Sequence, residues 1–138
     1  MATTRKAARL LTQLYDSHLS EHGIEGAQFA LLMTIDALPD KGQAAVADAM
    51  GMDKTTLSRN LKLLMARGWV DASPGKDARR RELALTKDGR AAMTKARPAW
   101  MRAQQSLQRA MGEMEWGPAL LAIQGVGRAA KAAADSEQ

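Results

Sequence analysis

The chain has 138 residues, enough for one domain with a single core, and its 46% apolar and 25% charged residues indicate a folded protein. It contains no cysteine, which excludes disulfides, cysteine-ligated zinc and thiol nucleophiles. Its net charge is +5, and we expect a cytoplasmic protein because no secretion signal and no membrane-spanning apolar stretch is visible.

The first half of the chain predicts four helices, because apolar side chains recur at helical spacing between residues that start or stop helices. Gly23 ends the first helix, Pro39 closes the second, and Gly68 is suited to end the fourth. Asp53 is suited to cap the start of the fourth. The helices are expected at residues 5–20, 27–38, 43–50 and 53–67.

The second half predicts a β-hairpin followed by two helices. Two short segments of strand-like composition flank a turn that contains Pro74 and Gly75. Thr86 is suited to cap the long helix that comes next. The strands are expected at residues 69–71 and 82–85, the turn at 73–76, and the helices from 86 to about 111 and from about 116 onward.

Large apolar side chains repeat every seven residues along the long helix. Met93, Trp100, Leu107 and Met114 recur every seven residues, with small alanines between them. Such a seam predicts a partner helix. Self-association of two chains is the simplest source of that helix.

The basic residues are concentrated in one stretch. Residues 54–81 hold eight lysines and arginines against two acids, so they carry the whole basic surplus, which is typical of a polyanion site. The stretch overlaps the spacing of a helix-turn-helix. Ala47 is small where two helices would cross, and Gly51, four residues later, permits a tight turn.

The helix expected at residues 53–67 has two distinct faces. Leu57, Leu61 and Leu64 face inward. The opposite face is interpreted as free of acids and of bulky apolar groups, so it is suited to enter a major groove; Asn60 falls nearer the inner face. The candidate DNA-binding residues of this helix are Lys54, Thr55, Thr56, Ser58, Arg59, Asn60 and Lys62.

Three segments carry a recognisable pattern: GIEGAQFALLMTIDAL, MDKTTLSRNLKLLMARGWV and GKDARRRELALTKDGRAAM. The third contains an Asp-x-Arg element at Asp77 and Arg79 and a Leu-Thr-x-x-Gly element that ends at Gly89. In these segments, which span about residues 23–93, the chain resembles the MarR family (multiple antibiotic resistance regulators).

The resemblance implies a mainly α-helical fold with a small β-hairpin wing. In one MarR-like domain of residues 1–138, a winged helix-turn-helix at about residues 25–90 is flanked by dimerisation helices at residues 1–22 and 91–138. The implied partners are a second copy of the chain and a pseudo-palindromic operator in double-stranded DNA.

The resemblance also implies how the wing and an effector act. Arg79 is expected to enter a minor groove, braced by Asp77. The implied function is a transcription regulator, a repressor released by a small aromatic or phenolic effector. The wing residues expected at DNA are Lys76, Asp77, Arg79 and Arg80, and the candidate effector-binding residues are His18, His22, Met33 and Trp100.

Two other classes of function, an enzyme and a protein-interaction module, are the alternatives. For an enzyme, His18 and His22 are one helical turn apart, a spacing that can chelate a metal, but no third ligand converges in the sequence. No phosphate-binding loop or nucleophile motif occurs, so we expect no catalytic residue, metal or cofactor. A protein-interaction module on a winged-helix scaffold is the second alternative, and the basic stretch argues against it as the main role.

Overall fold

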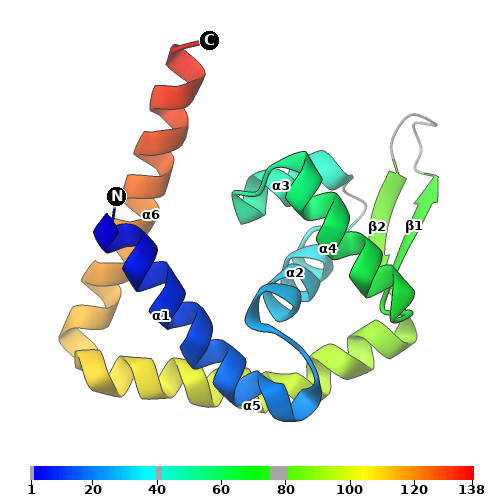
Figure 1. The fold of residues 1–138 in the computed structure, drawn as a ribbon, viewed down its shortest axis with the longest axis horizontal. Helices are drawn as coiled ribbons and strands as arrows, with labels where there is room; N and C mark the ends of the chain where they lie inside the picture. Colours follow the sequence, from blue (N-terminus) through cyan, green and yellow to red (C-terminus); the bar gives the residue numbers. More distant parts are fainter. Residues whose placement is uncertain (1, 40–41, 75–80) are drawn as a thin grey trace. The chain divides into compact units, whose positions relative to one another are not determined.

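The computed structural model describes residues 2–39, 42–74 and 81–138, which Figure 1 colours along the sequence. The chain divides into two compact units, Met1–Met101 and Arg102–Gln138. Among the described residues, no helix is both long and apolar enough to cross a membrane. The elements are α1 (Ala2–Leu19), the 3-10 turn η1 (Ser20–His22), α2 (Gly26–Ala37), α3 (Gln43–Met50), α4 (Lys54–Ala66), β1 (Val70–Pro74), β2 (Arg81–Leu85), α5 (Lys87–Met111) and α6 (Glu113–Ser136).

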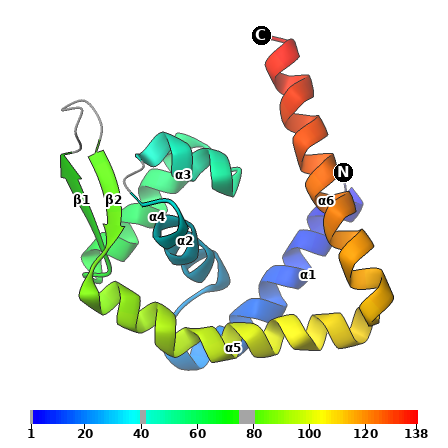
Figure 2. The ribbon, with the colours of Figure 1, turned by 180° about the vertical axis from the view of Figure 1, so that it is seen from behind.

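In the first unit, helices α2, α3 and α4 pack together and the hairpin lies beside them, as both views show (Figures 1 and 2). Strands β1 and β2 pair antiparallel, from Val70 opposite Leu85 to Pro74 opposite Arg81. The predicted fold class, mainly α-helical with a small hairpin wing, is therefore confirmed.

The predicted helices and strands are present, but several boundaries differ from the prediction. Helix α1 begins at Ala2 rather than at residue 5, and β1 extends to residue 74 rather than ending at residue 71. Pro74 belongs to β1 rather than to a turn, because it pairs with Arg81 across the hairpin. The last helix begins at Glu113 instead of near residue 116, because Gly112 interrupts the helical path with a φ of 84°. A φ in this left-handed region favours glycine, whose missing Cβ removes the steric penalty.

The core of the first unit includes the start of the seven-residue apolar repeat. Met93 and Ala96 are buried in it, and the Trp100 ring lies 6.2 Å from the Tyr15 ring and 5.8 Å from the Phe29 ring, between centroids. The interpretation of this part as a seam for a second chain is wrong, because the chain's own helices cover it. The buried cluster is Leu19, Ile24, Phe29, Leu31, Leu32, Ile35, Val46, Ala47, Leu57, Leu61, Leu64, Val70, Leu83, Met93, Ala96 and Ala99.

The start of α5 is tied to the start of the hairpin. Thr86 caps α5 as predicted, since its Oγ1 accepts a hydrogen bond from the Gly89 N–H at 2.9 Å. The same hydroxyl donates to the Gly68 carbonyl at 2.6 Å, and the Thr86 N–H donates to the Trp69 carbonyl at 3.0 Å. Residues 68–69 and the first turn of α5 therefore form one junction.

This junction predicts that Gly89 tolerates no side chain. A Cβ at Gly89 would lie 2.0 Å from the Trp69 carbonyl oxygen, so the backbone must shift. Gly89→Ala should lower the free energy of unfolding by about 1–3 kcal/mol in a urea titration followed by circular dichroism. The control is Gly117→Ala in α6, where an added Cβ meets nothing within 4 Å. Equal destabilisation of the two variants would contradict this packing argument.

Candidate nucleic-acid interface

Helices α3 and α4 form the helix-turn-helix that the sequence predicts. Val46 and Ala47 of α3 are buried. Gly51 ends α3 with a φ of 64°, and the Met52 N–H closes the turn by donating to the Ala47 carbonyl at 3.0 Å. The chain therefore enters α4 through a hydrogen-bonded turn.

The start of α4 is capped by Asp53, as predicted. The Thr56 N–H donates to the Asp53 Oδ1 at 2.6 Å. Hydrogen bonds from the Thr56 backbone and side chain hold the pKa of the Asp53 carboxyl below its ordinary value of 3.8, and the positive charge of Arg59 acts in the same direction. A lowered pKa means that this stabilisation is present above pH 3.8 and is lost as the pH falls through the lowered pKa.

The two faces of α4 are largely those expected from the sequence. Leu57, Leu61 and Leu64 are buried in the core. The side chains of the opposite face are exposed, which leaves three cations and a threonine available to a ligand. The exposed predicted residues are Lys54, Thr55, Arg59 and Lys62.

Three other predicted residues of α4 are half-buried: Thr56, Ser58 and Asn60. The Asn60 Nδ2 donates to the Thr56 carbonyl at 3.0 Å, so its amide is already engaged with its own helix. This placement agrees with the position of Asn60 near the inner face and puts it behind Arg59 as a candidate for reading bases.

The outer face of α4 also carries an apolar side chain that the sequence analysis missed. Leu63 is 51% exposed, so the interpretation that this face has no bulky apolar group is wrong. Leu63 lies four residues after Arg59, about one helical turn further on, and so shares its face. The four-residue spacing from Arg59 is the sequence feature that places Leu63 on this face.

Not every lysine and arginine of the basic stretch is available to a ligand. The Arg67 Nη1 donates to the Gly23 carbonyl at 2.6 Å, and its guanidinium carbon lies 3.7 Å from the centre of the Trp69 ring. Arg67 therefore holds the end of α4 to neighbouring segments. Arg81 is exposed at the start of β2. The predicted wing residues Lys76, Asp77, Arg79 and Arg80 lie outside the described residues.

No cavity described here is lined by more than one of the four candidate effector residues. The His18 Nδ1 lies 3.0 Å from the Leu14 carbonyl of the preceding turn, and the His22 Nε2 lies 3.4 Å from the Glu21 carboxylate. Met33 is partly buried against the core. Within the described part of the chain, no three His, Cys, Asp or Glu side chains are grouped so as to hold a metal.

Trp100 and His22 line two different cavities. The Trp100 cavity measures about 260 Å³ and is mostly apolar. Tyr15 contributes its phenol, and burial raises the pKa of that hydroxyl above its ordinary value of 10.0. The lining residues are Leu11, Thr12, Tyr15, Gly26, Ala27, Ala30 and Trp100.

Sequence and structure comparisons both find similarity to transcriptional regulators. A family model described as the MarR family matches residues 22–81. The chain is 37% identical to the Mycobacterium tuberculosis transcriptional regulator MosR, whose crystal structure is in complex with DNA; the match covers 95% of both chains with a TM-score of 0.86.

Two further relatives extend the comparison. The PcaV transcriptional regulator from Streptomyces coelicolor, in complex with its natural ligand, is 25% identical, with 93% of this chain and 91% of that chain covered and a TM-score of 0.83. The uncharacterized HTH-type transcriptional regulator YwoH of Bacillus subtilis (strain 168) is 25% identical over 83 residues. That match covers 60% of this chain and 61% of YwoH.

Proposed function

The chain belongs to the MarR family of transcriptional regulators, and we propose that it is a sequence-specific DNA-binding regulator whose helix α4 enters the major groove. The observation that carries this proposal is the outer face of α4, where Arg59 and Lys62 are exposed opposite a buried leucine face. Arginine and lysine on such a face donate hydrogen bonds to phosphates and to guanine edges. The proposed role is not enzymatic, and it is exercised in the cytoplasm.

We propose that two copies act together on a pseudo-palindromic operator. Helix α6 supports this, because Leu121, Ile123 and Val126 are 66%, 64% and 67% exposed on it, and exposed apolar side chains on one helix favour a protein partner. A twofold dimer presents two copies of α4 to two half-sites about one DNA turn apart, about 10 base pairs.

The wing and the effector complete the proposal. Lys76, Asp77, Arg79 and Arg80 lie in the segment that connects β1 to β2 and are proposed to meet the flanking minor groove. The regulator is proposed to act as a repressor that a small aromatic or phenolic effector releases. The Trp100 cavity supports such a ligand, because the Tyr15 phenol ring and the Trp100 indole provide aromatic surface.

A gel-shift titration tests the proposed function. The probe is the DNA that flanks the protein's own gene, and unlabelled DNA of the same composition but scrambled order is the competitor. We expect a complex that resists the scrambled competitor and yields to the unlabelled probe. A protein-interaction module on the same scaffold would instead show only weak, salt-sensitive binding to both DNAs.

Leu63 predicts a base contact of its own. An exposed leucine on a groove-entering helix is suited to touch the 5-methyl group of thymine. Replacing the contacted thymine with deoxyuridine removes only that methyl group and should weaken binding about fourfold. Leu63→Ala should weaken binding similarly and then be insensitive to the same replacement. A variant as sensitive as the wild type at every thymine would exclude this contact.

A further inference from the structure

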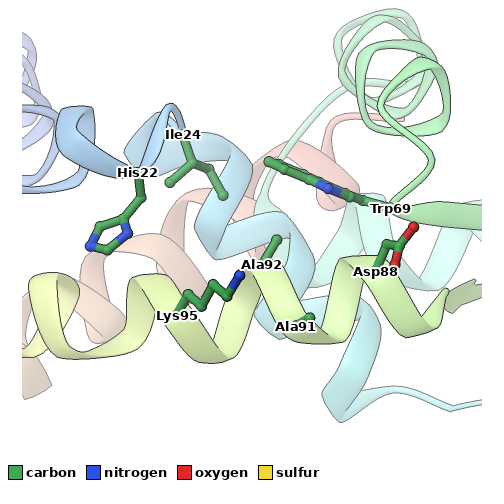
Figure 3. Close-up of a pocket in the computed structure, with 7 residues that line it drawn as sticks. All are labelled: His22, Ile24, Trp69, Asp88, Ala91, Ala92 and Lys95. Carbon is green, nitrogen blue, oxygen red and sulfur yellow. The ribbon is translucent and has the colours of Figure 1, made fainter.

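A second cavity, of about 320 Å³, lies within the first unit and shares no lining residue with the Trp100 cavity (Figure 3). One side of it is formed by His22, at the end of η1, together with Ile24 and Trp69. Helix α5 forms the other side. Figure 3 shows Trp69 and Lys95 extending toward the middle of the cavity from opposite sides.

Helix α5 gives this cavity opposite charges at its two ends. Asp88, Ala91, Ala92 and Lys95 line it at positions i, i+3, i+4 and i+7, which share one helix face. The Cα atoms of Asp88 and Lys95 are separated by about 10 Å along the helix axis, and the Lys95 side chain extends from its end toward the middle of the cavity (Figure 3). Within the described part of the chain, neither side chain forms an ion pair or a hydrogen bond. Both therefore remain available to a ligand.

The middle of the cavity is lined by apolar groups. Ala91 and Ala92 contribute only small side chains from α5, and the Trp69 indole lies across the cavity from them (Figure 3). The Arg67 guanidinium lies over the same indole, 3.7 Å from the ring centre, and is held in turn by the Gly23 carbonyl. An indole fixed in this way offers a flat surface to a second flat group at little cost in side-chain entropy.

The charges at the two ends specify the ligand. Asp88 accepts hydrogen bonds from an ammonium group, whereas Lys95 donates to a carboxylate, and His22 lies at the Lys95 end (Figure 3). A molecule with a flat apolar body and one charge at each end matches both ends.

We propose that this cavity binds an elongated zwitterion, with its ammonium group at Asp88, its carboxylate at Lys95 and its flat body between the Trp69 indole and the alanines. The site differs in place and in chemistry from the proposed aromatic effector cavity. Its test uses no DNA, so its outcome is independent of the proposed function.

The ligand also contacts a residue that joins three elements. The Trp69 N–H donates to the Leu64 carbonyl of α4 at 3.0 Å, and the Trp69 carbonyl accepts from the Thr86 N–H ahead of α5 at 3.0 Å. Trp69 itself leads into β1. A ligand that binds only the folded chain raises the melting temperature, so occupancy should be visible as thermal stabilisation.

The experiment is isothermal titration calorimetry of the full chain with three compounds of one shape. The zwitterion 4-(aminomethyl)benzoate carries both charges, 4-methylbenzoate lacks the ammonium group, and 4-methylbenzylamine lacks the carboxylate. We expect the zwitterion to bind at least about tenfold tighter than either analogue, because each loses one charged hydrogen bond. Equal affinity for the three compounds, or no heat at millimolar concentration, would overturn the proposal.

Two variants assign the charges to their residues. Asp88→Asn should bind the zwitterion and 4-methylbenzoate equally, and Lys95→Gln should bind the zwitterion and 4-methylbenzylamine equally. Lys87→Gln is the matched control, since Lys87 is an exposed cation of the same helix that does not line the cavity, and it should keep both preferences. Circular dichroism verifies that each variant is folded. Variants that keep the wild-type preferences would show that the compounds bind elsewhere.

Discussion

Raising the salt concentration from 50 to 200 mM should weaken operator binding by about 10³–10⁵-fold, because each phosphate contact releases condensed counterions. Helix α4 exposes Lys54, Arg59 and Lys62 in each copy. The sequence adds three cations in the segment between β1 and β2. Two copies of the chain are therefore expected to make about 6–10 phosphate contacts.

The slope of log affinity against log salt concentration, measured by fluorescence anisotropy, gives the number of contacts. Lys62→Gln should reduce the slope by about 1 for each copy bound, whereas Arg97→Gln, at an exposed position of α5, should leave it unchanged. An affinity that stays level across this range of salt would contradict a phosphate-binding role for the basic stretch.

Arg59→Ala should cost about 1–3 kcal/mol of operator binding and relax the preference at one base pair of each half-site. Arg59 is exposed on the side of α4 opposite Leu57 and Leu61, so its guanidinium can donate two hydrogen bonds to a guanine edge. The measurement is a binding titration against operators that vary at each position of the half-site.

A lysine at the same position separates charge from base reading. Arg59→Lys keeps the positive charge but lacks the planar fork, so the salt slope should persist while the preference for one base pair falls. Arg97→Ala serves as the control for removing an exposed arginine from the same unit. A variant Arg59→Ala that weakens binding to all sequences equally would reassign Arg59 to the phosphate backbone.

The local features of the interface were predictable from the sequence, because they depend on residues close together in the chain. Asp53 and Thr86 were expected to cap their helices, and each accepts a backbone hydrogen bond three residues later. The inward face of α4 was likewise expected, since helical spacing alone places its three leucines together.

The features that the sequence did not predict depend on tertiary packing. A seven-residue apolar repeat has the same spacing whether it packs within a chain or between chains. The sequence therefore did not show that Met93 and Trp100 pack against the core of their own chain. Tertiary packing also places His22 and Trp100 in different cavities, which their positions in the sequence do not reveal. Helical spacing places Leu63 on the outer face, but only the neighbouring elements decide that it stays uncovered.

Methylation interference tests most directly whether α4 reads the major groove. Dimethyl sulfate methylates N7 of guanine in the major groove and N3 of adenine in the minor groove, so one reagent compares both grooves. We predict that methylating one guanine in each half-site blocks the wild type and has no effect on the weaker binding of Arg59→Ala. Binding that tolerates every guanine methylation, and is blocked by adenine methylation alone, would show that α4 does not read the major groove.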